Sequence, residues 1–562
     1  MNKKYFLTSQ AMRIIAVSTA ALTVCACGKK PETQNQMTQS AGATMCSASS
    51  SNACAANATA SYSNSSGASY ACAATSSASS YFNYMPGPVY EELDWNTEEY
   101  SDIDENIFKE VAISPLSTFS ADVDTASYAN IRRMLNNGHD PKGFPKGSIR
   151  AEEMINYFSY DYAKPADGEI FGVEAEISEC PWNADNKLLR IGIQTEEADF
   201  KQSGDSNIVL LIDVSGSMRY DDKLPLVKDS VKLMLNNLGK KDRVSIVTYA
   251  SGVNVVLDGK KGNEKKKLTD ALDSLEAEGS TNGEGGIEEA YSLAEKYFIE
   301  DGNNRVIIFS DGDFNIGRTS ESELSDLIKE KAESGIYLTV LGYGSGNYSD
   351  ARMETLADDG NGNYAYIDSL TEAKKVLVDE FGSTMITVAK DVKFQVEFNP
   401  CYVSDYRLIG YENRAMANEE VNDDKKDAGE IGAGHGVTVL YEIVPANEDK
   451  ENGLNLKYQK TEPTDEALNS NEWLTLSIRY KEPDSDTSTL KQYNIGDNCY
   501  SNNPSDDFKF AAAVAEFSMI LRDSEYIGDG SLEHVSKTLK KTKLDDDYKK
   551  EFADLVKKSL EY

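Results

Sequence analysis

The sequence predicts an α/β fold with a doubly wound, mostly parallel sheet, flanked by an antiparallel β-sandwich-like domain and by C-terminal helices. Between residues 205 and 384, short apolar runs alternate with amphipathic segments at helical spacing. This is the pattern of buried parallel strands joined by helices. From residue 385 onwards, apolar and polar residues alternate one by one. A period of two is typical of half-buried antiparallel strands, so a second kind of sheet should follow the first.

Length and charge limit what the chain can be. A chain of 562 residues is too long for a single hydrophobic core, so several domains are expected. The formal net charge is -36 at pH 7, which argues against nucleic acid or an anionic lipid surface as the ligand. The simpler explanation of this acidity is that it keeps an exposed protein soluble.

Residues 1–26 have the features of a lipoprotein signal peptide. Two lysines and an arginine precede an apolar stretch, 14–26, that is too short to span a bilayer. The small residues before Cys27 resemble a bacterial lipobox, and Ala26 fits the cleavage position better than Val24 before Cys25. We therefore expect Cys27 to become the acylated first residue. The alternative is ordinary secretory cleavage beside an incidental cysteine.

Residues 27–116 are expected to form the acylated cysteine and a disordered tether. From about 28 to 80 the composition is dominated by Ser, Ala, Asn and Thr, with almost nothing large to bury. A flexible coil of about 53 residues has a mean reach of roughly 40 Å, enough to hold a folded part away from a membrane. The expected location is therefore the cell envelope, on the extracytoplasmic side, with a lipid anchor in the membrane.

Besides Cys25 and Cys27, the chain has six cysteines. Three lie in the tether, where no fold can position them for a metal or redox role. The other three, Cys180, Cys401 and Cys499, lie in segments that should fold outside the cytosol. Three pairings are open to them, and the sequence does not choose one.

Residues 117–204 should form an α+β region that leads into the central domain. Asp124 is expected to cap a helix that ends at Gly138. Ser148 similarly precedes a second helical segment, and two strand-like runs follow it. Asp122 and Asp124 could instead bind a cation, although the capping role is preferred.

The central domain, residues 205–384, carries the pattern with the clearest chemistry. The apolar run 208–212 ends in Asp213, and Ser215 and Ser217 follow at alternate positions. Ligands of open α/β sheets bind at the carboxyl ends of the strands, where these side chains should lie. One carboxylate and two hydroxyls are hard oxygen donors, which suit Mg²⁺ or Mn²⁺ better than zinc.

Two later positions complete a possible ligand set. Thr281 lies in a loop just before a helical segment, and Asp311 ends a second buried-strand pattern. In this order and at these element ends, the five side chains resemble the metal-ion-dependent adhesion site (MIDAS) of the von Willebrand factor type A (VWA) domain, a Rossmann-like fold. The resemblance implies one divalent cation, bound directly by Ser215 and Ser217. Asp213, Thr281 and Asp311 would bind it directly or through water, and an Asp or Glu of a partner protein would complete the shell.

The resemblance extends over nearly everything from Ser117 to the C-terminus. Residues 117–135, 298–317 and 406–416 are similar to a family of bacterial VWA lipoproteins, which have their own N-terminal region and C-terminal β-rich region. Ser310 stands where many relatives have Thr, outside the five ligand positions. This resemblance implies binding of a protein ligand, in adhesion or in assembly of an envelope complex.

Residues 385–562 should form a β-rich region that ends in helices. The alternation places Val392, Phe394, Val396 and Phe398 on one face of a strand. Such strands suggest a β-sandwich, which could also recruit the strands before the central domain. An Ala-rich helix should begin near Asp506, whose charge favours the positive end of a helix.

We therefore expect a protein-binding lipoprotein and not an enzyme, with no catalytic residues. The three histidines, His139, His435 and His534, belong to no HExxH or nucleophile motif, and the chain has no P-loop. Two alternatives stay open. The metal could merely stabilise loops of an envelope scaffold, or it could activate water in a metal-assisted hydrolase.

Overall fold

The computed structural model describes residues 98–198, 204–281, 283–312, 321–346, 348–426, 428–447, 457–458, 462–483, 485 and 487–562. The predicted signal peptide, Cys27 and most of the predicted tether lie outside the described residues. Within the described part of the chain, no helix is long and apolar enough to cross a membrane.

The central domain contains a six-stranded sheet in the order β10-β9-β8-β5-β6-β7. All neighbouring strands run parallel except β7, which pairs antiparallel with β6 at the edge of the sheet. The predicted mostly parallel sheet is therefore confirmed, and β7 adds an antiparallel strand at its edge. The strands are β5 (Ser206–Asp213), β6 (Arg243–Tyr249), β7 (Val253–Lys261), β8 (Asn303–Ser310), β9 (Ile336–Tyr343) and β10 (Tyr364–Ile367).

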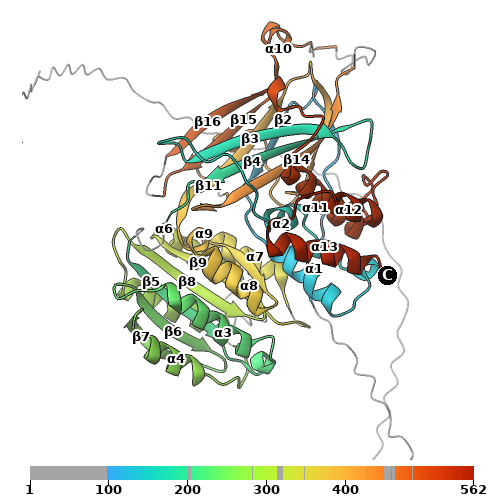
Figure 1. The fold of residues 1–562 in the computed structure, drawn as a ribbon. Helices are drawn as coiled ribbons and strands as arrows, with labels where there is room; N and C mark the ends of the chain where they lie inside the picture. The colour runs from blue at the N-terminus through green and yellow to red at the C-terminus, as the bar shows by residue number, and fades with distance from the viewer. Residues whose placement is uncertain are drawn as a thin grey trace, which may run out of the picture. The chain divides into compact units, whose positions relative to one another are not determined.

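Helices cover both faces of this sheet, as in Figure 1. Along β5, Ile208, Leu210 and Ile212 pack into the core beneath α3 and α4, whereas Val209 and Leu211 pack into the core beneath α5, α6 and α7. Because the residues on both faces of β5 are fully buried, its sequence is one continuous apolar run. The helices are α3 (Leu224–Met234), α4 (Lys265–Asp273), α5 (Gly283–Lys296), α6 (Glu321–Glu333), α7 (Asp350–Asp359), α8 (Leu370–Lys374) and α9 (Phe381–Met385).

A β-sandwich is built from strands on both sides of the central domain in sequence. One sheet has the order β1-β12-β14-β4-β3, and in the other β11 pairs with β13, β15 and β2, while β16 pairs with β15. The central domain is thus inserted between β4 and β11. The strands are β1 (Lys109–Glu110), β2 (Leu116–Ser120), β3 (Phe171–Glu179), β4 (Lys187–Thr195), β11 (Thr387–Phe398), β12 (Val403–Ile409), β13 (Ile431–Gly432), β14 (Gly436–Pro445), β15 (Glu472–Lys481) and β16 (Ser488–Gly496).

The face of β11 predicted to be apolar forms part of the sandwich core. Val392, Phe394, Val396 and Phe398 are each at most 1% exposed. They share one hydrophobic cluster with alternate residues of β15 and with residues of β4 and β14. The predicted sandwich, including its recruitment of the earlier strands, is therefore confirmed.

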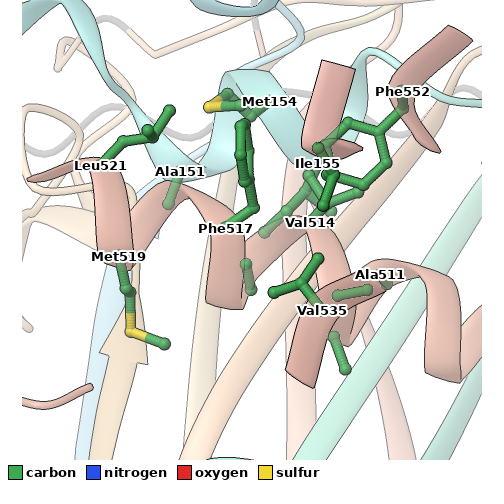
Figure 2. Close-up of a cluster of buried hydrophobic side chains, with 14 of the residues drawn as sticks. Ala151, Met154, Ile155, Ala511, Val514, Phe517, Met519, Leu521, Val535 and Phe552 are labelled. Carbon is green, nitrogen blue, oxygen red and sulfur yellow. The ribbon is translucent and has the colours of Figure 1, made fainter. Parts of the chain in front are cut away.

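Helices from the two ends of the described chain pack together in a further core. Met154 and Ile155 of α2 and Phe552 of α13 gather around Val514 and Phe517 of α11 (Figure 2). The alanines of α11 let neighbouring helices approach closely, so this helix is buried along most of its length. The helices are α1 (Ala126–Asn136), α2 (Ala151–Asn156), α11 (Asp506–Arg522), α12 (Leu532–Leu539) and α13 (Asp547–Ser559), with the short α10 (Asp465–Asn469) elsewhere.

The predicted tether does not extend to residue 116. Arg133 binds both carboxylate oxygens of Glu98, at 2.8 and 2.9 Å, and Val111 is 2% exposed. Lys109–Glu110 also forms β1, the edge strand of the sandwich. Residues 98–116 have large side chains and charges with partners, so this segment can offset the entropy cost of ordering.

The predicted capping role of Asp124 is wrong. Helix α1 begins at Ala126, and its N-cap residue, Thr125, makes no side-chain capping hydrogen bond. Asp124 Oδ1 instead accepts a hydrogen bond from the backbone N–H of Tyr364 in β10, at 2.9 Å. Its carboxylate therefore connects the N-terminal region to the edge of the central sheet.

The three cysteines in the described part of the chain, Cys180, Cys401 and Cys499, form no disulfide. Cys180 and Cys499 are buried, and burial raises the pKa of both thiols. Cys180 belongs to the helical core, whereas Cys499 belongs to the sandwich core.

Candidate metal centre

The two candidate aspartates follow adjacent central strands of the parallel sheet. Asp213 is the last residue of β5, and Asp311 directly follows β8, with Ile212 paired to Phe309 in the register. Both carboxylates are fully buried. Because parallel strands end at the same edge, the topology brings these two side chains together, as the sequence predicts.

The loop after β5 folds back on its own aspartate. Asp213 Oδ1 accepts a hydrogen bond from the Ser215 N–H at 2.7 Å. The hydroxyls of Ser215 and Ser217 lie 3.0 Å apart, and Ser217 belongs to a short 3₁₀ turn, Gly216–Arg219. The alternate spacing of Asp, Ser and Ser therefore places one carboxylate and two hydroxyls on the same side of a tight loop.

The loop that carries Thr281 is held against this first loop by backbone hydrogen bonds. The Gly216 N–H donates to Gly279 O at 3.0 Å, and the Glu278 N–H donates to Val214 O at 2.8 Å. Gly279 has a φ of +86°, and a Cβ there would lie 2.4 Å from Ser251 Oγ. The half-buried Thr281 follows two residues later. Its segment adjoins the loop that carries the two serines.

The donor set fits a divalent cation. Asp213 Oδ2 is buried and makes no hydrogen bond of good geometry among the described residues, and the hydroxyl of the buried Tyr249 lies near this carboxylate. Burial raises the pKa of Asp213 to about 7, the Ser215 amide opposes this, and the charge of Asp311 adds to it. A cation would offset both the burial and the mutual repulsion of the carboxylates. Ser215 and Ser217, with Asp213, Thr281 and Asp311, would hold Mg²⁺ or Mn²⁺ through oxygen alone.

Lys223 is a part of this site that sequence reasoning missed. Its Nζ lies 2.9 Å from Asp311 Oδ2, and the side chains are 4% and 0% exposed. Lys223 is the N-cap residue of α3, so in the sequence it looks like an ordinary charged residue before a helix. The one sequence feature that could have indicated this role is its position ten residues after Asp213, at the start of the helix that follows the same loop.

A second group of buried carboxylates, near Asp122, is paired with arginine side chains. Oxygens of Asp122, Glu153 and Glu354 lie within 4.8 Å of one another. Arg414 Nε donates to Asp122 at 2.8 Å, whereas Arg150 pairs with Glu153 at 2.9 Å and with Glu354 at 2.8 Å. These guanidinium groups supply positive charge inside the cluster, so a metal ion is not needed to account for it.

Comparison with known families agrees with this architecture. The family model "von Willebrand factor" matches residues 94–190, and the model "von Willebrand factor type A domain" matches 207–379. The model for the C-terminal region of "Uncharacterized protein YfbK" matches 383–561. The three regions correspond to the N-terminal region, the inserted central domain and the C-terminal part of the sandwich with its helices.

Individual relatives cover different shares of the chain. The protein YfbK of Escherichia coli (strain K12) is 42% identical over 469 residues, which is 82% of this chain and 80% of YfbK. Human inter-alpha-trypsin inhibitor heavy chain H2 is 27% identical over 151 residues, 25% of this chain and 15% of its own. A solved von Willebrand factor type A structure from Catenulispora acidiphila has 14% identity and a TM-score of 0.39, covering 71% of this chain and 91% of its own. The chain belongs to the bacterial von Willebrand factor type A domain family that includes YfbK of E. coli.

Proposed function

We propose that this chain is a lipid-anchored protein of the cell envelope that binds a protein ligand through one divalent cation in its VWA domain. The observation that carries the proposal is the buried oxygen cluster at the sheet edge, where Asp213 Oδ2 makes no hydrogen bond of good geometry among the described residues. A VWA domain supports a protein-interaction or adhesion-type role.

The proposed binding step follows from the coordination preferences of the ion. Mg²⁺ prefers six oxygens in octahedral geometry, so a site with few direct carboxylates leaves a position for water or an incoming group. A Glu or Asp of the partner would take that position. The chain's net charge of -36 does not forbid this contact, because charges beyond about 8 Å are largely screened at physiological salt.

The anchor is the second part of the proposal. Cys27, after the signal peptide, would carry the lipid, and the Ser- and Ala-rich segment after it would let the folded part search for a partner near the membrane. Mass spectrometry of the mature N-terminus tests this part separately. A diacylated Cys27 supports it, and an unmodified N-terminus at another residue contradicts it.

Metal binding can be tested with the mature chain carrying Cys27→Ser, which keeps it soluble. Isothermal titration with Mg²⁺ and Mn²⁺ should show one site, lost in Asp213→Ala and weakened in Thr281→Ala. Thr269→Ala on α4 is the matched control, because Thr269 is also half-buried and lies outside the site. Equal binding by all four proteins would refute the metal centre.

Ligand capture requires a second experiment. Envelope extracts passed over the immobilised chain should yield a partner in Mg²⁺ that EDTA releases and that Thr281→Ala fails to retain. If Thr281→Ala abolished metal binding but left capture intact, the metal would only support the loops and the scaffold role would be preferred. If the partner were retained equally in Mg²⁺ and in EDTA, its binding surface would have to lie outside the metal site, and the β-sandwich would be tested next.

A further inference from the structure

We propose that Lys223 is a built-in counter-cation that sets the ligand preference of the metal site. In this role it limits the affinity for the divalent ion and keeps the loaded site net positive, so that the site selects an anionic ligand. The inference rests on the proposed metal-binding function and concerns the specificity of the same site.

The ammonium of Lys223 is fixed in place by its surroundings. Its aliphatic stem crosses Gly344, where a Cβ would lie 2.3 Å from Lys223 Cε. Gly344 has a φ of +79°, a conformation that glycine adopts without strain. The loop beneath the stem is itself held, because the Gly346 N–H donates to Glu98 Oε1 at 3.0 Å. Lys223 is therefore a buried part of the site and not a surface lysine that happens to lie nearby.

The net charge of the metal-loaded site decides whether it prefers an anionic ligand. In the metal-bound state, with Asp213 and Asp311 both ionised, the two carboxylates and the Lys223 ammonium together contribute one negative charge. A divalent cation turns this into one positive charge, which a partner carboxylate would neutralise. Without Lys223, the same ion would give a neutral site, and the attraction for an anion would fall.

Lys223 should therefore have opposite effects on the two binding steps. Its ammonium repels the incoming metal ion and attracts the ligand carboxylate that follows. At separations of about 4 Å and an effective dielectric constant of about 20, one unit charge is enough to change an equilibrium constant by roughly tenfold or more. A lysine with a purely structural role would not produce this inverse relation.

Mn²⁺ and acetate are suitable probes for the experiment. Titration with Mn²⁺ gives the metal affinity, and water proton relaxation of the bound Mn²⁺ reports displacement of its coordinated water by acetate. We expect Lys223→Met to bind Mn²⁺ about tenfold more tightly or better and acetate correspondingly more weakly. Lys223→Gln should change both in the same directions, and Lys223→Arg, which keeps the charge, should resemble the wild type.

Lys241→Met is the matched control. Lys241 also pairs with an aspartate, Asp205 at 3.3 Å, but this pair lies at the amino-terminal end of β5, roughly 25 Å of strand away from the site. Lys241→Met removes the same charge from the chain and should leave the affinities for Mn²⁺ and for acetate unchanged.

The outcomes separate this inference from the proposed function. If the wild type bound no Mn²⁺, the metal site itself would be refuted. If the wild type bound Mn²⁺ and both folded variants, Lys223→Met and Lys223→Gln, matched it in Mn²⁺ and acetate affinity, only the role of Lys223 would be refuted. Thermal unfolding in the absence of metal identifies which variants are folded.

Discussion

Arg132 of α1 and Glu372 of α8 form an ion pair of 2.6 Å in which the side chains are 2% and 1% exposed. The same guanidinium pairs with Asp368, and the Tyr157 hydroxyl donates to Glu372 Oε2 at 2.7 Å. These contacts join the N-terminal region to the inserted central domain. Buried ion pairs thus connect the central domain to the N-terminal region, in addition to the two chain connections, from β4 and to β11.

Arg132→Met should strongly destabilise the fold, because it removes the guanidinium that pairs with two buried carboxylates, those of Asp368 and Glu372. Breaking a buried pair in this way costs about 3–5 kcal/mol. Chemical denaturation of the mature chain measures the free energy of unfolding. Lys232→Met is the control, since its pairs with Asp229 and Asp273 lie at the surface and should contribute little. Equal losses in the two variants would show that the Arg132 network does not stabilise the fold.

Gly344→Ala should destabilise the chain for two reasons. The backbone would be held at a φ of +79°, which costs an alanine on the order of 1–3 kcal/mol, and the new Cβ would press on Lys223. Gly346→Ala separates these effects, because Gly346 has a φ of +93° and open space around its Cβ position. A larger loss of thermal stability in Gly344→Ala than in Gly346→Ala is expected, and the reverse order would contradict the close packing of Lys223.

The elements predicted most accurately were those in which burial leaves a periodic signal. The continuous apolar runs of β5 and β8 and the alternation in β11 each follow directly from which faces are covered. The positions of Asp213 and Asp311 at one sheet edge follow in turn from the parallel topology.

Long-range polar contacts could not be predicted in the same way. Asp124 was expected to cap a helix, since an aspartate before a helical pattern usually has that role. Its actual partner, the Tyr364 N–H, is 240 residues away in sequence. Lys223 was missed for the same reason, because its pairing with Asp311 depends on how two loops meet after the sheet has formed.

Stability should fall as the pH rises from mildly acidic to mildly basic values. Burial raises the pKa of Glu354 to about 8 from its ordinary value near 4.5, although Arg150 and Arg414 oppose the increase. A carboxyl whose folded-state pKa is raised contributes stability that is complete below its unfolded pKa and is lost as the pH passes the folded value. The loss from Glu354 should therefore develop between about pH 4.5 and 8.

Denaturation curves from pH 5 to 9 test this dependence. Glu354→Gln cannot ionise, so its stability should vary less over the range than that of the wild type. Glu330→Gln on α6 is the control, because Glu330 is exposed and should leave the pH dependence unchanged. A wild-type curve that rises towards pH 8, or one that Glu354→Gln does not flatten, would contradict the assignment to Glu354.

Metal binding should also stabilise the fold. An ion that binds only the folded chain adds about 2.7 kcal/mol to the free energy of unfolding at a free concentration 100 times its Kd. Mg²⁺ should therefore raise the thermal midpoint of the wild type, and Asp213→Ala should abolish the increase because it removes a buried ligand. Asp229→Ala, at an exposed position of α3, should respond as the wild type does. An equal response to Mg²⁺ in Asp213→Ala would place the stabilising ion elsewhere on the chain.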